Sequence, residues 1–222
     1  MMDLIVNEVF GSFQGEGVHT GIPTLFIRLA GCNLRCEWCD TAYALEASSG
    51  SRIELSSLLE QVKRSRIGNV CLTGGEPLVQ EGSLEFVKIL LSEGFQVDIE
   101  TNGSIDIGPY VLLGEELLIS LDIKLPSSGM EGEMLLRNIG LLRPSDQLKF
   151  VARDKRDLEH AFTIMKEHSP RCRIIFTPVN NTGGDVIADV LMKKLGSGEI
   201  TGDIRLMVQS HKVIWGPDRK GV

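Results

Sequence analysis

The sequence predicts an α/β fold, an open and incomplete (β/α) barrel of about six βα units with an N-terminal extension. Short apolar runs alternate along the chain with longer segments of helical period, which is typical of a parallel sheet covered by helices. The 222 residues are fewer than the roughly 250 that a complete (β/α)₈ barrel takes. Nearly all chemically suggestive residues fall at the C-terminal ends of the predicted strands, where such folds bind ligands.

The elements follow in order after a polar opening around residues 12–17. Strands are expected where apolar residues form short runs, at 24–30, 69–73, 96–100, 117–122, 147–151, 173–176 and 203–207. Helices are expected where apolar residues recur at helical spacing, as in Leu55, Leu58 and Val62, over 54–64, 83–92, 155–167 and 185–195. No linker, repeat or low-complexity tract interrupts this series, so we expect one domain over residues 1–222.

The composition, with 42% hydrophobic and 24% charged residues, is that of a soluble globular chain. The net charge of −7 disfavours nucleic acid as a partner and favours a small molecule or a protein. No apolar run approaches the ~18 residues of a membrane span. Arg28 is the first basic residue, so the charged start of a signal peptide is missing. We therefore expect a cytoplasmic protein that binds no membrane.

Three of the five cysteines, Cys32, Cys36 and Cys39, form a Cys-x₃-Cys-x₂-Cys motif directly after the first predicted strand. In a reducing compartment this grouping indicates a metal or cluster site rather than a disulfide framework. Three thiolates can hold three irons of a [4Fe–4S] cluster and leave the fourth iron open. A structural zinc ion is the alternative, with His19 or Cys71 as fourth ligand, although zinc motifs usually contain two pairs of cysteines. In their strand patterns, Cys71 and Cys172 read most simply as buried apolar residues.

The cysteine motif and its position resemble the radical S-adenosylmethionine superfamily. The resemblance implies that the open iron chelates S-adenosylmethionine, and that electron transfer from the cluster yields a 5′-deoxyadenosyl radical. It places Trp38 near the adenine, with packing over the loop as the alternative. The run from Thr73 through Gly74, Gly75 and Glu76 to Pro77 resembles the second signature of the superfamily. There the glycines admit a close ligand and Glu76 suits its amino group.

Polar residues at the following strand ends extend this expected cofactor site. Glu100 and Asn102 resemble the polar strand end that the superfamily places near the ribose, although Asn-Gly is also a common turn. Asp122 and Lys124 follow the next predicted strand, where burying a charge is costly without a ligand or partner. Lys149 also resembles a residue near the cofactor, with a solvated strand edge as the alternative.

A narrower resemblance begins before the first predicted strand. The stretch Phe-Gly-Ser-Phe-Gln-Gly-Glu-Gly from Phe10 to Gly17 reads, on its residues alone, as an exposed loop too rich in glycine for a strand interior. Together with other segments it resembles the 7-carboxy-7-deazaguanine synthase family from about residue 7 onward. Those segments are Arg28, Cys-Asp-Thr at 39–41, Leu-Pro-Ser-Ser-Gly-Met at 125–130, 147–151 and the tail at 209–216. Many family members carry Ser-Pro-Lys at positions 122–124, so Lys124 transfers more safely than Asp122.

The narrower resemblance implies a carbon–nitrogen lyase that converts 6-carboxy-5,6,7,8-tetrahydropterin to 7-carboxy-7-deazaguanine and ammonia, on the route to deazapurine nucleosides such as queuosine or archaeosine. It implies a substrate-binding segment at about 7–23, a cluster loop at 31–41 and a magnesium ion on Thr41. Helix capping is the alternative for this threonine. Arg28 is expected to grip the substrate carboxylate through two hydrogen bonds, or else to leave the sheet edge for solvent. The residues implied at the pterin are Phe13, Gln14, Gly15, Glu16, Arg28 and Thr73.

Two other functions stay open. A radical-generating activase acting on a protein glycine shares the short barrel and cysteine loop, but it has no use for the segment 13–15. A non-catalytic iron–sulfur carrier seldom needs glycine and carboxylate sites at successive strand ends. The resemblance also implies a homodimer and an electron donor such as flavodoxin or ferredoxin. The role of His211 and Trp215 in the tail is left open.

Overall fold

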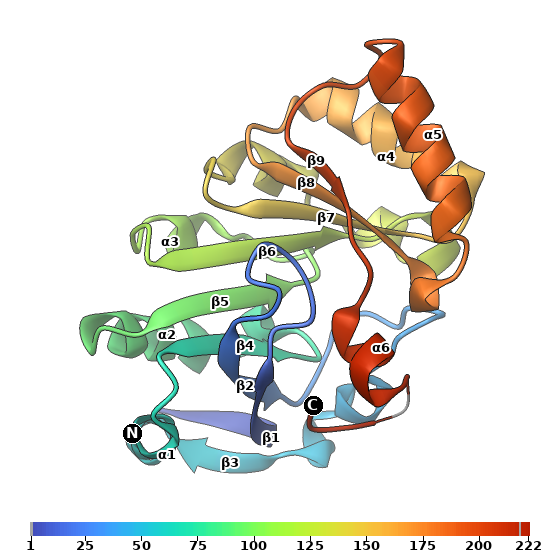
Figure 1. The fold of residues 1–222 in the computed structure, drawn as a ribbon. Helices are drawn as coiled ribbons and strands as arrows, with labels where there is room; N and C mark the ends of the chain where they lie inside the picture. The colour runs from blue at the N-terminus through green and yellow to red at the C-terminus, as the bar shows by residue number, and fades with distance from the viewer. Residues whose placement is uncertain (1, 218) are drawn as a thin grey trace.

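The computed structural model describes residues 2–217 and 219–222, which form one nine-stranded sheet with α-helices packed on it. The strand order is β3-β1-β2-β4-β5-β6-β7-β8-β9, and among the described residues the two outer strands do not pair to close a barrel. Figure 1 shows a strongly curved sheet whose two faces are covered by different segments. The predicted incomplete barrel is confirmed. The strands are β1 (Asp3–Phe13), β2 (Pro23–Leu29), β3 (Ser51–Glu54), β4 (Asn69–Gly74), β5 (Gln96–Thr101), β6 (Leu117–Ile123), β7 (Gln147–Ala152), β8 (Arg173–Pro178) and β9 (Ile204–Leu206), and the α-helices are α1 (Leu55–Ser65), α2 (Gly82–Ser92), α3 (Gly108–Val111), α4 (Lys155–His168), α5 (Gly184–Gly196) and α6 (Ser210–Trp215).

The parallel part of the sheet follows the sequence prediction closely. Each predicted strand is present as β2 or one of β4 to β9, and neighbours from β2 to β9 pair in parallel. The predicted helices correspond to α1, α2, α4 and α5. Two connections depart from a regular βα repeat. α3 is only four residues long, and β6 is joined to β7 through short 3₁₀ turns at Pro126–Ser128, Glu131–Glu133 and Leu136–Leu141.

The N-terminal residues form a long strand, so the prediction of an exposed loop from Phe10 was wrong up to Phe13. β1 pairs antiparallel with both β2 and β3, and Phe10 stacks on Phe26 with ring centroids 5.1 Å apart. Gly11 fits this strand because a Cβ there would lie only 3.0 Å from Ile67 Cδ1. Pairing on both sides and close packing, rather than apolar periodicity, hold this strand in place.

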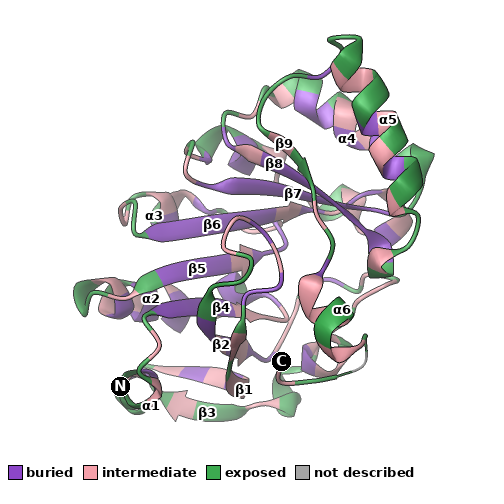
Figure 2. Cartoon of the chain, in the orientation of Figure 1, coloured by how far each residue is buried: buried purple, intermediate pink, exposed green. Residues whose placement is uncertain are grey.

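Residues on the central strands alternate between an apolar outer face and a polar inner face. Val97 and Ile99 of β5 belong to the hydrophobic core, whereas Asp98 and Glu100 point to the opposite side. The same alternation gives β7 two inward polar side chains, and Figure 2 shows the central strands as the most buried part of the molecule. The barrel interior is therefore lined with hydrogen-bonding and charged groups rather than packed with apolar side chains.

α4 illustrates how local sequence fixes the helices outside the sheet. The Asp154 side chain caps its first turn by accepting a hydrogen bond from the Asp157 N–H at 3.0 Å. Leu158, Ala161 and Ile164 bury its inner face. Within the described residues, no helix has both the length and the apolar character needed to cross a membrane.

Candidate functional site

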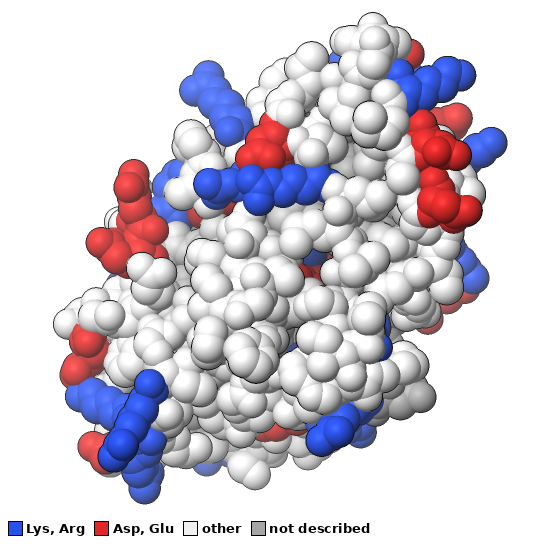
Figure 3. Space-filling view, in the orientation of Figure 1, with Lys and Arg blue, Asp and Glu red and all other residues white. Residues whose placement is uncertain are grey.

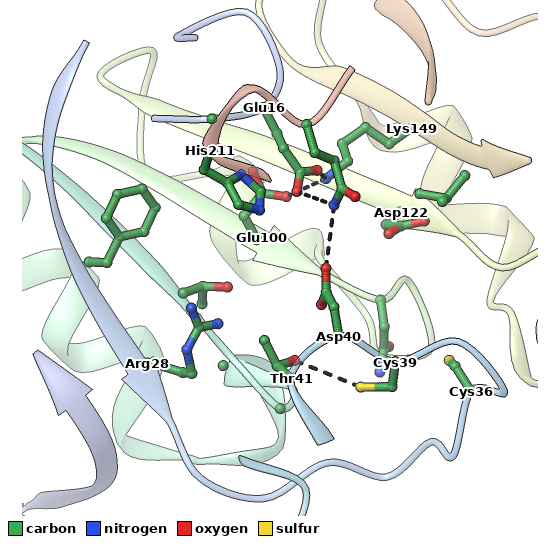
Figure 4. A pocket seen from close by; sticks show the side chains of 18 of the residues that line it. Glu16, Arg28, Cys36, Cys39, Asp40, Thr41, Glu100, Asp122, Lys149 and His211 are labelled. Atoms are coloured by element: carbon green, nitrogen blue, oxygen red, sulfur yellow. Dashed lines mark hydrogen bonds and ion pairs between the residues drawn. The ribbon is translucent and has the colours of Figure 1, made fainter. Parts of the chain in front are cut away.

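A cavity at the C-terminal ends of the parallel strands collects nearly all the predicted site residues. Its walls come from the β1–β2 connection, the cysteine loop, the ends of β2 and β4 to β7, and the tail around α6 (Figure 4). Of the predicted residues, only Glu76 does not line it. This convergence follows from topology, since parallel neighbours bring their C-terminal ends to the same edge of a sheet.

The cysteine loop is held at its base and along its length. The backbone N–H groups of Gly31 and Cys32 donate to the carbonyls of Ala44 and Leu45 at 2.8 and 2.9 Å. Arg35 donates to the Cys32 carbonyl at 2.8 Å from within the loop. The loop is therefore preformed, with its three thiols facing one cavity.

The three thiols differ in their surroundings. The Cys32 Sγ accepts from the Leu34 N–H at 3.4 Å and from Asn102 Nδ2 at 3.8 Å. Burial raises the pKa of the Cys32 and Cys36 thiols, and Lys124 partly offsets this for Cys36. Metal binding needs the thiolate form, so loading iron releases protons here.

The described residues contain no group of three His, Cys, Asp or Glu side chains arranged around a single ion. A cluster takes one cysteine at each of three irons, so this arrangement does not conflict with it. The two residues considered as a fourth zinc ligand lie elsewhere. His19 pairs with Asp98 at 2.9 Å, and Cys71 is fully buried within β4, outside the cavity lining.

Gly74 and Gly75 are required by neighbouring backbone, which differs from the predicted role of admitting a ligand. A Cβ on Gly74 would lie 2.2 Å from the Leu29 carbonyl oxygen, and one on Gly75 would lie 2.2 Å from that of Gly31. Gly74 also has φ +145°, which disfavours other residues. The two glycines thus bring the end of β4 against β2 and the cysteine loop.

Glu76 lies behind the side chains that line the cavity, and its predicted contact with a cofactor amino group stays a prediction. Its fully buried carboxylate accepts hydrogen bonds from the Leu78 N–H, the Thr101 hydroxyl and the Asn102 N–H at 3.0, 2.8 and 2.6 Å. Burial raises the pKa of Glu76 to about 7, against the pull of these donors. Glu76 therefore acts on the cavity indirectly, by fixing the end of β5.

Lys149 lies between two carboxylates at the centre of the cavity wall. Its Nζ is 2.7 Å from Glu16 Oε2 and 3.1 Å from Glu100 Oε2, and its side chain is only 5% exposed. The alternative of a solvated strand edge was therefore wrong, because β7 lies between β6 and β8. Burial disfavours the Lys149 charge, but Glu100 and Glu16 raise its pKa well above the usual value.

The two carboxylates respond differently to the same lysine. Burial opposes ionisation of Glu16, yet Lys149 outweighs it and lowers the pKa of Glu16 to about 2. For Glu100 burial prevails over Lys149, so the pKa of Glu100 is raised. Lys149 thereby fixes the β1–β2 connection onto the inner face of β5 and β7.

Asp122 and Lys124 form a second buried pair on the cavity wall. Lys124 Nζ donates to Asp122 Oδ2 at 2.9 Å. Asp122 Oδ1 is buried and has no hydrogen-bond partner among the described residues. An acceptor left in this state is costly, so it marks a place where a ligand with a hydroxyl or N–H donor fits.

Arg28 turns into the cavity rather than toward solvent. Its Nε donates to Glu8 Oε1 at 2.7 Å, and its side chain is 14% exposed. Neither terminal nitrogen of the guanidinium has a hydrogen-bond partner within the described part of the chain. Figure 4 shows Arg28 and Thr41 facing the same space.

Trp38 and Thr41 both line the cavity. Trp38 donates from Nε1 to Ser127 Oγ at 3.2 Å, and its ring faces Lys124 Nζ at 5.5 Å from the centroid. Thr41 precedes a 3₁₀ turn at Ala42–Ala44, but its side chain makes no capping hydrogen bond. The capping alternative was therefore wrong, and within the described residues the only hydrogen-bond contact of the hydroxyl is with Cys39 Sγ at 3.7 Å.

The tail supplies cavity residues that the sequence did not identify. Gln209 Nε2 donates to Glu16 Oε1 at 2.8 Å and approaches Asp40 Oδ2 at 3.4 Å. Lys212 Nζ donates to the same Asp40 oxygen at 2.8 Å. His211, whose role was left open, packs on Gly15 so closely that a Cβ there would lie 2.2 Å from its Nδ1. The tail therefore ties the β1–β2 connection to the end of the cysteine loop.

The residues present fit the expected cofactors. Three thiols from one loop face the cavity, which suits a cluster with an open iron. Next to them, the unpartnered Asp122 oxygen and the Lys124 ammonium offer sites for the polar groups of S-adenosylmethionine. The residues predicted for the cofactors and those predicted for the substrate line one cavity, which has room for contact between the two molecules.

Comparisons with known proteins identify the family to which the chain is similar. Residues 26–123 match the radical SAM superfamily. A protein of Thermoplasma acidophilum named 7-carboxy-7-deazaguanine synthase is 40% identical over 96% of this chain and 98% of its own. One with the same name from Leptospira interrogans is 38% identical over 98% and 97% of the two chains.

Solved structures support the fold. The crystal structure of QueE from Escherichia coli superposes with a TM-score of 0.76 at 24% identity, covering 95% of each chain. Streptococcus suis SuiB bound to its precursor peptide SuiA matches with a TM-score of 0.58 at 13% identity, over 79% of this chain and 46% of that one. With near full-length relatives at 40% and 38% identity, the chain belongs to the 7-carboxy-7-deazaguanine synthase family of radical SAM proteins.

Proposed function

We propose that the chain converts 6-carboxy-5,6,7,8-tetrahydropterin to 7-carboxy-7-deazaguanine with loss of ammonia, within deazapurine biosynthesis. One observation carries the proposal: the three-cysteine loop lines the same cavity as Arg28, whose terminal guanidinium nitrogens have no partner among the residues that the structure describes. The names of the full-length relatives support the choice of substrate. When bound, the reduced cluster and S-adenosylmethionine supply the 5′-deoxyadenosyl radical that starts the ring contraction.

Arg28 binds the carboxylate of the pterin. Glu8 holds the guanidinium by Nε, so the two terminal nitrogens remain for a bidentate grip. Thr73 is paired in register with Arg28 on the neighbouring strand, close enough to hold the ring beside that carboxylate. The remaining substrate contacts come from Phe13, Gln14, Gly15 and Glu16, which line the same cavity.

The groups assigned to the cofactors line the same cavity as Arg28. Cys32, Cys36 and Cys39 ligate the cluster, and Trp38 packs near the adenine. Asp122 Oδ1 and Lys124 bind polar groups of S-adenosylmethionine because the first lacks a donor and the second carries a fixed charge. The remaining cofactor-side residues are Gly74, Gly75, Glu100, Asn102 and Lys149, with Glu76 behind them.

Thr41 and the substrate together bind a magnesium ion. A lone hydroxyl is a poor Mg²⁺ site, because this ion prefers six oxygens and keeps several waters. Turnover is expected to rise with added Mg²⁺ and to fall with a chelator, and Thr41→Ala should blunt this dependence while leaving the iron content unchanged. If the chelated wild-type enzyme turns over as fast as the magnesium-saturated one, the assignment is wrong.

The proposal extends to partners and location. We expect a homodimer, and the exposed apolar side chains of Phe13, Val213 and Ile214 offer surface for it. Light scattering on the purified protein tests this. Reduction of the cluster needs a one-electron donor such as flavodoxin or ferredoxin, and free cysteines suit the cytoplasm.

One experiment separates this function from its two rivals. The anaerobically reconstituted, reduced protein is mixed with the tetrahydropterin acid, S-adenosylmethionine and Mg²⁺, and the products are followed by mass spectrometry. We expect 7-carboxy-7-deazaguanine only when S-adenosylmethionine is present. Cofactor cleavage without this product would favour an activase acting on a protein glycine, and no cleavage at all would favour an iron–sulfur carrier.

A further inference from the structure

The β1–β2 connection crosses the open face of the barrel, below the cavity just described. Figure 1 shows this segment, residues 14–22, lying across the inner side of the central strands. It is short of apolar anchors, since Ile22 is 40% exposed and most other residues are small or polar. Two backbone hydrogen bonds close its ends, Gln14 N to Ile22 O at 2.9 Å and Gly21 N to Gln14 O at 2.8 Å. Polar contacts rather than apolar burial must therefore hold the middle of this segment against the strands.

His19 makes the first of two polar anchors in that middle. Its Nδ1 lies 2.9 and 3.0 Å from the two carboxylate oxygens of Asp98. Asp98 is 1% exposed and also accepts from Asn69 Nδ2 at 3.3 Å. Asp98 lies two residues before Glu100 on the same face of β5, so this contact is one layer below the cavity.

Gln147 makes the second anchor, on β7. Its buried side-chain oxygen accepts from the Val18 N–H at 2.9 Å, and its Nε2 donates to Ser120 Oγ at 2.7 Å. Gly17 passes so close that a Cβ there would lie 2.3 Å from Gln147 Nε2. Gln147 precedes Lys149 by two residues on the same strand face, which repeats the arrangement on β5.

The two anchors and the cavity contact lie within four residues of the chain, 16–19. Glu16 contacts Lys149 in the cavity layer, Val18 contacts Gln147 below it, and His19 contacts Asp98. The Gln14 side chain is also fixed, because its Oε1 accepts from the Glu16 N–H at 3.2 Å. A displacement of residues 18 and 19 would therefore also shift residues 14–16, which line the cavity.

We propose that His19, through Asp98, and Gln147 are positioning residues that hold segment 14–16 in its substrate-binding conformation. Neither residue touches the cavity, and no motif surrounds His19. This inference rests on the proposed function, because it assigns the pterin to the segment that the anchors hold. Releasing an anchor lets the segment sample other conformations, which lowers the apparent affinity for the pterin in proportion to the competent fraction.

The pH response of the anchor follows from the groups around His19. Its hydrogen bond to Asp98 raises the pKa of His19 above 6.5, against burial and the positive charge of Arg173 on β8. A pKa raised in the anchored state means that the charged pair strengthens the anchor at lower pH and loses this strength as pH rises through that pKa. The other ionisable groups around the same small cleft are Glu115, Glu116 and Arg205.

The test compares His19→Ala and His19→Gln with His160→Ala, a control histidine on α4 outside this region. Equilibrium binding of the tetrahydropterin is measured by anaerobic calorimetry on reconstituted protein with S-adenosylmethionine and Mg²⁺, alongside kcat and KM. We expect His19→Ala to weaken pterin binding about tenfold or more, as for loss of one charged hydrogen bond. Iron content and pterin-independent cofactor cleavage should match wild type.

The pH profile separates positioning from general support of the fold. Wild type and His160→Ala should lose pterin affinity as pH rises through the pKa of His19. His19→Gln keeps a donor for Asp98 but does not titrate, so it should restore most of the affinity and remove this step. If His19→Ala does not fold, His19→Gln and Asp98→Asn carry the test. The first removes the titrating imidazole and the second removes its anionic partner, each with a side chain of similar size.

The outcomes are distinct for each claim. Unchanged pterin affinity in folded His19→Ala, or a pH step that persists in both His19→Gln and Asp98→Asn, overturns the positioning role. Wild-type protein that neither binds nor converts the pterin overturns the proposed function instead. Weakened iron binding in His19→Ala would also contradict the inference, because it would place the effect at the cysteine loop.

Discussion

Arg28→Lys is expected to bind the tetrahydropterin about ten- to a hundredfold more weakly than wild type, the effect of losing one charged hydrogen bond of about 1.5–3 kcal/mol. In the structure Arg28 Nε donates to Glu8. The two terminal nitrogens of the planar guanidinium remain to bind a carboxylate. A lysine ammonium at this position is drawn to Glu8 and has no second, fixed donor. Steady-state kinetics should show the loss mainly as a higher KM, because the interaction with the carboxylate is already lost in the substrate complex.

A matched control is available on β3, which β1 separates from the strand of Arg28. Arg52 pairs with Asp3 at 2.9 Å but is 72% exposed and far from the cavity lining, so Arg52→Lys should bind the pterin as wild type does. Iron content and S-adenosylmethionine cleavage without substrate should be unchanged in both variants. Wild-type pterin affinity in Arg28→Lys would refute the carboxylate assignment.

Lys149→Met should both abolish turnover and lower the free energy of unfolding by about 3–5 kcal/mol, as expected when one partner of a buried ion pair is removed. Methionine fills similar volume but leaves Glu16 and Glu100 facing each other without a cation. Denaturant unfolding of the cluster-free protein measures the loss. The loss should shrink at acidic pH, because protonation removes the repulsion between the two carboxylates.

Two further variants identify the cause of that loss. The double variant Lys149→Met with Glu100→Gln removes one of the stranded charges, so it should recover part of the stability and none of the turnover. Lys155→Met, at the exposed start of α4, should leave stability within about 0.5 kcal/mol of wild type. Wild-type stability in Lys149→Met would show that the two carboxylates do not depend on this lysine.

The parallel strands could be predicted from the sequence, and the location of the candidate site follows from them. β4 to β8 are buried on both faces and flanked by turn residues, which gives each a compact pattern of its own. Once the strands are known, their C-terminal ends must meet at one edge. Arg28, Thr73, Asp122 and Lys149 were therefore placed together without knowledge of any contact between them.

The parts that sequence did not predict depend on contacts between distant residues. β1 owes its strand conformation to pairing with β2 and β3, and no periodicity of its own shows this. The hydrogen-bond partners of Glu76 could not be predicted either, because Thr101 and Asn102 lie 25 and 26 residues later in the chain. Gln209 reaches Glu16 across 193 residues, a separation at which sequence spacing carries no information.

One signal in the sequence was nevertheless available for the inner face of the barrel. Asp98 and Glu100 alternate with Val97 and Ile99, although a strand buried on both faces usually reads as a continuous apolar run. Ser120 and Asp122 repeat this alternation on β6. Polar residues at every second position of central strands indicate a polar barrel interior, and this pattern would have identified Asp98 as a buried group in need of a partner.

The iron content and EPR spectrum of the reconstituted protein test most directly whether Cys32, Cys36 and Cys39 hold a cluster with an open iron. After anaerobic reconstitution we expect about four irons per chain. We also expect the EPR spectrum of the reduced cluster to change when S-adenosylmethionine is added. Cys36→Ala, measured in parallel, should lose both signals while the exposed control Arg52→Lys keeps them. A stoichiometric zinc content with no iron uptake, or a reduced cluster whose spectrum S-adenosylmethionine leaves unchanged, would contradict this assignment.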